Sequence, residues 1–139
     1  MEIEWVNHAG FVQRHRDVAL LSDPWLSGTA FNDGWELLVP SLFTPSDVAS
    51  VTHIWFSHEH PDHFSPPVLK KIPAEVRQGV QVVFQTSPDQ RVAEFCRSIG
   101  FTVHEVRDRK ADQRHGQERA AIRTQGHVAS FVAVRTSAT

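Results

Sequence analysis

The amino-acid sequence predicts an α/β fold, and two of its features carry that prediction. Between residues 51 and 106, segments rich in β-branched and aromatic residues alternate with segments of helical character. The chain has 139 residues, of which 40% are hydrophobic and 22% are charged, as is typical of a globular domain with its own core. We therefore expect residues 1–139 to belong to a single domain.

The first part of the chain predicts three short strands. Apolar residues at Ile3 and Trp5 alternate with polar ones, and a polar turn at residues 7–10 separates them from the next apolar pair. This pattern favours two antiparallel strands, at about residues 3–6 and 10–14. A third strand over residues 18–22 ends before Pro24, because proline cannot donate to a sheet ladder.

Residues 24–47 predict a long loop that holds Trp25, Phe31 and Trp35. Loops of this length inside compact domains are often functional. The three aromatic side chains could wall a pocket if they are exposed together. The alternative is that they pack back onto the core as anchors.

The clearest helix of the sequence follows Ser87. Ser87 is a natural N-cap, Pro88 suits the first helical position, and Gln90 completes a capping box. Gly100 provides a stop. One apolar face is formed by Val92, Phe95, Cys96 and Ile99, so Cys96 is expected to be a core residue rather than a nucleophile.

The remaining elements complete the strand–helix alternation. A buried strand over residues 51–57 precedes a short helix over 66–72, and further strands are expected at 80–85 and 101–106. The charged segment 107–119 predicts a solvated loop or hairpin, and two more strands are expected at 120–124 and 130–135.

Composition narrows the classes of partner and the compartment. The formal net charge of -2 does not favour nucleic acid as a partner. The N-terminus lacks a signal-peptide pattern, and no apolar stretch approaches the ~20 residues that span a bilayer. The single cysteine cannot form an internal disulfide, which favours a reducing compartment. We expect a cytoplasmic protein that acts on a small molecule and does not bind a membrane.

A cluster of metal-binding side chains follows the strand at 51–57. Three histidines and an aspartate fall within six residues, as His58, His60, Asp62 and His63. In an extended backbone, residues two apart project to the same side, so His58 and His60 could meet one metal. Asp62 and His63 come after a proline turn and could face a second metal nearby. The alternative is an accidental group of exposed side chains.

The HxHxDH string resembles the signature of the metallo-β-lactamase superfamily. The segments Asn7–Phe11 and Leu21–Gly28 are similar to the opening of its lactonase-like branch, which includes the ascorbate-6-phosphate lactonases. The segment Trp55–Phe64 also resembles the metallo-β-lactamase-like domain of CMP-N-acetylneuraminate hydroxylases. The resemblance extends over residues 1–106 and less fully to residue 135. It implies the N-terminal half of an αβ/βα sandwich, with a mixed β-sheet and flanking helices.

The resemblance also implies roles for individual residues. His58 and His60 would bind a first metal together with His127, whereas Asp62 and His63 would bind a second metal. A surface turn is the alternative place for His127. Asp23 matches an early aspartate that orients ligands, and His8 would lie at the mouth of the site.

The implied chemistry is hydrolysis of an ester, lactone or phosphoester by a metal-bound hydroxide, with Asp62 as the catalytic proton acceptor. One or two divalent ions are expected, first of all Zn²⁺, with Mn²⁺ or Fe²⁺ as alternatives.

The sequence departs from the family in the metal ligands that the family takes from the second half of its fold. Between His127 and Thr139 there is no further aspartate, glutamate or histidine, although the family takes a bridging aspartate and a last histidine from its second half. We therefore expect an incomplete domain that lacks most of this second half. Its uncovered sheet face would favour self-association. Two alternatives to a hydrolase follow: a non-catalytic metal-binding remnant, and a module completed by another chain.

Overall fold

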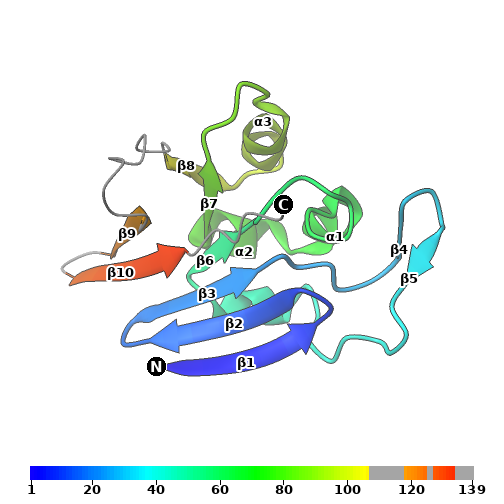
Figure 1. Ribbon diagram of the computed structural model, residues 1–139, viewed down its shortest axis with the longest axis horizontal. Helices are drawn as coiled ribbons and strands as arrows, with labels where there is room; N and C mark the ends of the chain where they lie inside the picture. Colours follow the sequence, from blue (N-terminus) through cyan, green and yellow to red (C-terminus); the bar gives the residue numbers. More distant parts are fainter. Residues whose placement is uncertain (107–117, 125–126, 134–139) are drawn as a thin grey trace.

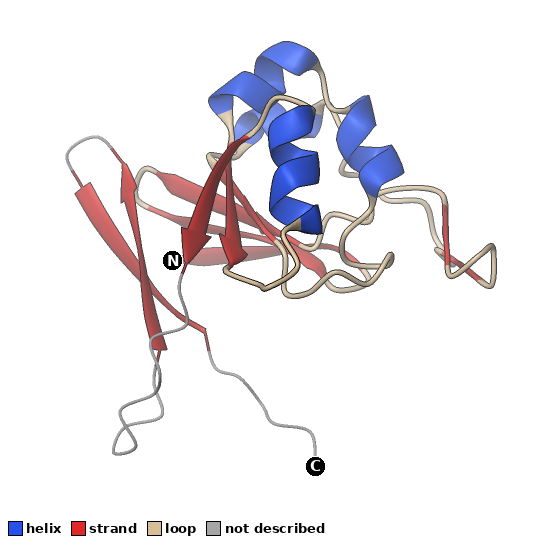
Figure 2. Ribbon diagram, turned by 90° about the horizontal axis from the view of Figure 1, so that it is seen from above, coloured by secondary structure: helices blue, strands red, loops and turns tan. Residues whose placement is uncertain are grey.

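The computed structural model describes residues 1–106, 118–124 and 127–133, and it has a mixed α/β fold. Its main body is a six-stranded sheet with helices packed on one face (Figures 1 and 2). The strand order is β1 (Glu2–Asn7), β2 (Gly10–His15), β3 (Val18–Ser22), β6 (His53–Trp55), β7 (Gln81–Gln85) and β8 (Thr102–Val106). The predicted α/β class, with its mixed sheet and flanking helices, is confirmed.

The direction of the strands decides where a site can form. Strands β1, β2 and β3 are antiparallel neighbours, whereas β3, β6, β7 and β8 are parallel to one another. Therefore β1, β3 and β6 run in the same direction, and their carboxyl ends meet at one edge of the sheet. In open α/β sheets, ligands bind outside this edge.

The core lies between the sheet and the helices. A row of apolar residues crosses four neighbouring strands in register, as Val12, Leu21, Ile54 and Val82, and each of them is fully buried. Helices α1 (Pro66–Lys71) and α3 (Arg91–Ser98) cover this face with buried apolar side chains. Burying each such side chain stabilises the fold by about 1.5–3 kcal/mol. The core therefore fixes the register of the strands that carry the site.

The opposite face of the sheet carries a smaller apolar cluster among polar residues such as His53 and Gln81. Leu20 and Val83 are buried there, and the half-buried Trp55 packs against them. Toward the edge strand β1, Ile3 and Trp5 are 62% and 71% exposed. The edge of this face thus carries two large apolar side chains in contact with solvent.

The helix after Ser87 begins later than the sequence predicts. α3 begins at Arg91, and Gln90 rather than Ser87 is its N-cap. The Ser87 hydroxyl instead accepts a hydrogen bond from the backbone N–H of Asp89, in a turn that precedes the helix. Gly100 follows the helix with a φ of +100°, a left-handed conformation that glycine adopts without steric cost.

Several short elements were not predicted. They are the β4–β5 hairpin (Thr29–Ala30 and Trp35–Glu36), the 3₁₀ helix η1 (Asp47–Ser50) and helix α2 (Ala74–Gly79). Figure 2 shows the β4–β5 hairpin projecting from the main body. The long predicted loop is therefore partly ordered by its own backbone pairing.

Strands β9 (Glu118–Thr124) and β10 (His127–Ala133) form a separate antiparallel pair. They correspond to the strands predicted at 120–124 and 130–135, although residues 134 and 135 lie outside the described residues. So does the predicted charged loop, up to residue 117. In the described part of the chain, no helix has the length and apolar character needed to cross a membrane.

Candidate metal centre

The histidine cluster lies in the loop that follows β6, at the carboxyl edge of the sheet. Phe56 and Phe64 lie near the two ends of this loop, where both are buried and their rings meet edge-on at 5.1 Å. Within the loop, the backbone N–H groups of His63 and Phe64 both donate to the carbonyl of His60. The aromatic anchors and this tight turn hold residues 58–63 at the sheet edge.

His58 and His60 form the first pair of potential ligands. The Nε2 atom of His58 lies 3.0 Å from the Nδ1 atom of His60, and their ring centroids are 4.5 Å apart. The pKa of His58 is lowered, mainly by burial and then by the neighbouring imidazoles of His63 and His60. The carboxylates of Asp23 and Asp62 oppose this shift. A lowered pKa keeps the imidazole neutral at neutral pH, which is the form that binds a metal.

Asp62 and His63 form a second group, and His8 joins them. One Asp62 oxygen, Oδ2, lies 3.3 Å from Nε2 of His63 and 2.9 Å from Nε2 of His8. One ligand atom from each of the three side chains lies within 4.8 Å of the others. His8 comes from the β1–β2 turn, which meets the β6 loop because β1 and β6 end at the same edge.

Asp62 is a buried carboxylate with an unused oxygen. Its residue is 6% exposed, and its Oδ1 atom has no hydrogen-bond partner among the described residues. Burial alone would raise the pKa of Asp62. The hydrogen bond from His8, a backbone hydrogen bond and the nearby His63 outweigh burial, and the pKa is lowered. Asp62 is therefore an anion at neutral pH, and a bound cation would satisfy its free oxygen.

Asp23 connects the end of β3 to the cluster. Its Oδ1 atom accepts a hydrogen bond from the backbone N–H of Ser57 at 2.7 Å, and its Oδ2 atom lies 3.1 Å from Nδ1 of His63. In metal sites, a carboxylate on the far nitrogen of a histidine fixes the tautomer and the ring orientation. The position of Asp23 leaves Nε2 of His63 directed at Asp62.

Ser57 is a contact that sequence reasoning missed. Its hydroxyl lies 2.8 Å from Nδ1 of His58 and 3.2 Å from Nδ1 of His63. It therefore touches one histidine of each group. Its place directly before His58, at the end of a predicted strand, was the available signal.

The aromatic residues of the long loop divide between core and surface. Trp25 is 2% exposed and packs as a core anchor, with its ring 5.4 Å from that of His8. Phe31 and Trp35 are exposed and stack edge-on at 5.1 Å. Phe31 lies 6.1 Å from the His60 ring, and Trp35 lies 6.3 Å from the His8 ring. These two residues form an apolar wall beside the ligand groups.

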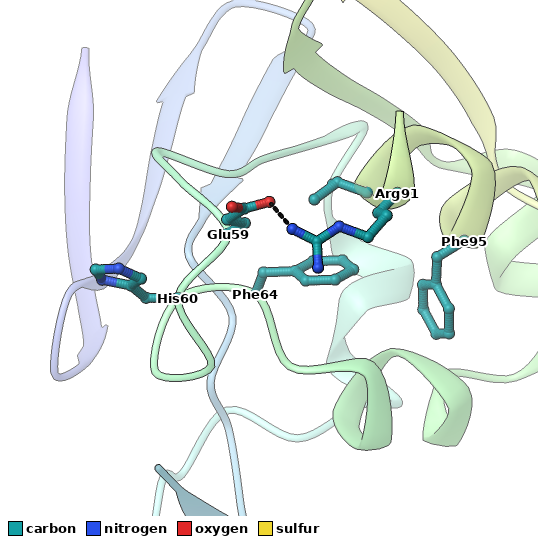
Figure 3. Close-up of a pocket in the computed structure, with 6 residues that line it drawn as sticks. Glu59, His60, Phe64, Arg91 and Phe95 are labelled. Carbon is teal, nitrogen blue, oxygen red and sulfur yellow. Dashed lines mark ion pairs between the residues drawn. The ribbon is translucent and has the colours of Figure 1, made fainter. Parts of the chain in front are cut away.

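A hollow of about 410 Å³ opens next to His60, between the β6 loop and α3. Figure 3 shows Glu59 of the loop reaching toward Arg91 of α3, at 3.6 Å, with Phe64 and Phe95 among the lining residues. Both charged side chains are exposed, so their ion pair contributes little stability. The hollow combines an apolar floor with a charged rim.

His127 is the first residue of β10. This agrees with its expected place at the start of a late strand, but the position of its side chain lies outside what the structure describes.

The residues present fit a divalent cation. They supply imidazole nitrogens and a carboxylate, the donors that Zn²⁺, Mn²⁺ and Fe²⁺ accept. The unpaired Oδ1 atom of the buried Asp62 and the Asp23–His63 contact are both features of a metal-ligand set.

A comparison with models of protein families shows the family to which the chain belongs. A family model described as "Beta-lactamase superfamily domain" matches residues 2–129. The chain belongs to the beta-lactamase superfamily. Within this superfamily, the described residues correspond to the N-terminal part of the metallo-β-lactamase fold.

Curated relatives in the superfamily match over part of the chain. The chain is 38% identical over 76 residues to the human "Inactive cytidine monophosphate-N-acetylneuraminic acid hydroxylase". It has the same identity over the same length to the "Cytidine monophosphate-N-acetylneuraminic acid hydroxylase" of Pongo pygmaeus. The match covers 52% of this chain, and 15% and 12% of those two proteins.

Solved structures show the same fold. A "possible metal-dependent hydrolase" from Veillonella parvula aligns with a TM-score of 0.57 and 20% identity, covering 75% of this chain and 41% of that one. An isothiocyanate hydrolase from Delia radicum gut bacteria aligns with a TM-score of 0.55 and 19% identity, covering 85% and 43%. The chain thus spans less than half the length of either structure.

Proposed function

We propose that this chain forms the metal-binding part of a metal-dependent hydrolase. The observation that carries the proposal is the buried Asp62, with one oxygen unpaired, between His63 and the turn of β1 and β2. Family membership adds support, because the match includes the whole cluster. We assign residues 1–139 to one domain of this hydrolase.

In the proposed site, His58 and His60 hold a first ion, and Asp62 and His63 hold a second. His127 is proposed as a further ligand of the first ion. When bound, such ions acidify a water molecule to a pKa of about 7 and stabilise negative charge on a reacting oxygen. Zn²⁺ is the first choice, and Mn²⁺ and Fe²⁺ suit the same donors.

The side chains of the chain itself then divide the remaining tasks. Asp62, an anion at neutral pH, accepts a proton from the attacking water or orients it. Asp23 and Ser57 hold the His63 ring in place through their contacts with Nδ1. Phe31 and Trp35 bind the apolar part of a substrate and exclude water from one side of the site.

We infer a small-molecule substrate with an ester, lactone or phosphoester bond. The hollow beside His60 has the volume of a small-ligand pocket. A net charge of -2 gives no electrostatic attraction for nucleic acid. The single buried cysteine fits a reducing compartment, and we propose the cytoplasm.

A second candidate function is metal binding without turnover by this chain alone, either as a remnant or as a module completed by another chain. A catalytic zinc site has three protein ligands and an open position. The described side chains supply only His58 and His60 for the first position, which favours this alternative.

Metal content and turnover together test the proposal. The purified chain is analysed for bound metals, then assayed with p-nitrophenyl acetate, a γ-lactone and bis-p-nitrophenyl phosphate. The proposal expects the wild type to bind metal and to turn over a substrate. Turnover should be lost in His58→Ala/His60→Ala, and the metal content should fall to that of the second position. Both should be retained in His15→Ala, which removes an exposed histidine at the end of β2. Bound metal without turnover supports the second candidate, and absence of bound metal overturns both.

A further inference from the structure

We propose that His8 is a third protein ligand of the second metal position, beside Asp62 and His63. The inference rests on the proposed function, since it assumes that this position binds a divalent cation. From the sequence, His8 was expected only at the mouth of the site. The structure brings it into contact with a residue 54 positions away in the chain.

Distances support a shared ion. Bonds from zinc to nitrogen and oxygen ligands are about 2.0–2.1 Å long, so two ligands of one tetrahedral zinc lie about 3.3 Å apart. The Oδ2 atom of Asp62 lies 2.9 Å from Nε2 of His8 and 3.3 Å from Nε2 of His63. Both separations from the carboxylate are therefore close to that of two ligands on one ion, and all three donor atoms lie within 4.8 Å of one another.

The orientation of the two histidine rings supports the same assignment. His63 has Asp23 and Ser57 at its Nδ1 atom, which leaves Nε2 for the metal. His8 directs Nε2 at Asp62 in the same way, and its ring lies 5.7 Å from the ring of His63. Both imidazoles thus present the same atom to the same carboxylate.

The backbone of the β1–β2 turn holds His8 in this position. His8 has a φ of +36°, in the left-handed region that non-glycine residues seldom occupy. The neighbouring Asn7 is buried and donates from Nδ2 to the carbonyl of Trp25 at 2.7 Å. The indole of Trp5 donates to the His8 carbonyl at 3.3 Å. These two contacts from the end of β1 therefore maintain an unfavourable conformation that directs the His8 side chain at Asp62.

A weaker role for His8 is a hydrogen bond that only orients Asp62. The two roles differ in the number of imidazoles bound to the ion. As a ligand, His8 contributes one imidazole, whereas as an orienting residue it contributes none.

The test isolates the second position in the full-length chain. In the His58→Ala/His60→Ala background, the first position is removed, and Co²⁺ is titrated as the probe. We expect one equivalent to bind, with two imidazoles counted by X-ray absorption. Adding His8→Asn should reduce the count to one. It should weaken binding by more than about 100-fold, because loss of a residue that merely supports a ligand costs about 10–100-fold.

Controls separate folding from ligation. Asparagine and glycine both tolerate a positive φ, so His8→Asn and His8→Gly should still unfold cooperatively and keep the native circular dichroism spectrum in the absence of metal. His15→Ala should leave Co²⁺ binding unchanged.

Each of the other results is decisive. An unchanged imidazole count after His8→Asn overturns the ligand role while the proposed function stands. Metal binding by the wild type but not by His58→Ala/His60→Ala also overturns the ligand role of His8, because the second position then does not bind an ion by itself. A wild type that binds no metal overturns the proposed function and this inference together.

Discussion

Asp23→Asn tests how the proposed second metal position is oriented. The Asp23 carboxylate is 5% exposed and makes two contacts, with the backbone N–H of Ser57 and with Nδ1 of His63. Asparagine has nearly the same shape but only one acceptor oxygen. If that oxygen keeps the shorter contact to Ser57, the amide NH₂ faces Nδ1 of His63. When Nε2 of His63 binds a metal, Nδ1 carries its proton, and two donors then oppose each other.

The magnitude follows from the contact that is lost. A hydrogen bond to a charged group contributes about 1.5–3 kcal/mol. Since 1.4 kcal/mol corresponds to a factor of ten, the metal at the second position should bind about 10–100-fold more weakly. A competition titration between the protein and a chromophoric zinc chelator, performed in the His58→Ala/His60→Ala background, measures this difference.

An unchanged affinity in a folded Asp23→Asn variant would refute this reasoning. It would mean that the hydroxyl of Ser57, 3.2 Å from Nδ1 of His63, orients the ring without Asp23. Glu2→Gln makes the same chemical change at an exposed position on β1 and should leave zinc affinity unaltered.

Three further predictions concern the turn, the core and the surface. Gly10→Ala would place a Cβ 3.1 Å from Oδ1 of Asn7. Urea denaturation should therefore show a free energy of unfolding lower by about 1–3 kcal/mol, and a decrease below roughly 0.5 kcal/mol would contradict the tight packing. Burial raises the pKa of Cys96 from 9.0 to about 12, so the folded chain keeps the thiol proton. The resulting stability is present below pH 9.0 and is lost as pH rises toward 12, by about 1.4 kcal/mol per unit. Urea unfolding above pH 9 should therefore reveal a steeper loss in the wild type than in Cys96→Ala, and equal slopes would refute it. Trp5→Lys removes an exposed apolar side chain beside Ile3 and should reduce self-association of the chain in sedimentation velocity; a wild type that stays monomeric at all concentrations would contradict this.

The main strands and α3 were predictable because each carries its own periodic pattern. β2 and β3 alternate or are continuously apolar over five or six residues, and the observed bounds agree closely with those predicted. The N-terminus of α3 was less predictable. Ser87 can cap a helix or close a local turn with the same hydroxyl, and here it accepts from Asp89 in a turn.

The missed elements have no such pattern. Helix α2 buries none of its residues fully, and only its half-buried Val76 packs against the core, so it has no apolar stripe. β4 and β5 have two residues each. Elements this short are stabilised by their surroundings rather than by their own sequence.

The candidate site likewise contains residues that the sequence predicts and residues that only the fold brings together. Residues 58–63 are contiguous, so their ligand spacing can be read directly from the sequence. His8 meets Asp62 only because β1 and β6 run in the same direction and end at one edge, which depends on the strand order of the whole sheet. The contact between Asp23 and His63 likewise needs β3 to lie beside β6. The resemblance to a known family anticipated Asp23, but the spacing of residues did not.

The two residues that reach the cluster from other strands share a backbone feature. His8 and Asp23 follow β1 and β3, and their φ angles are +36° and +41°. Non-glycine residues in this region cost about 1–3 kcal/mol each and persist only where their surroundings compensate. For Asp23, the compensation includes the hydrogen bond from its N–H to the carbonyl of Trp55 and the two contacts of its carboxylate. For His8, it includes the hydrogen bond from the indole of Trp5 to its carbonyl and the contact of its ring with Asp62. The strained backbone at the two strand ends thus places His8 beside Asp62 and Asp23 beside His63, two neighbouring residues of the cluster. This is the arrangement that the proposed site requires, because it brings a proposed ligand and an orienting carboxylate to the cluster from two other strands.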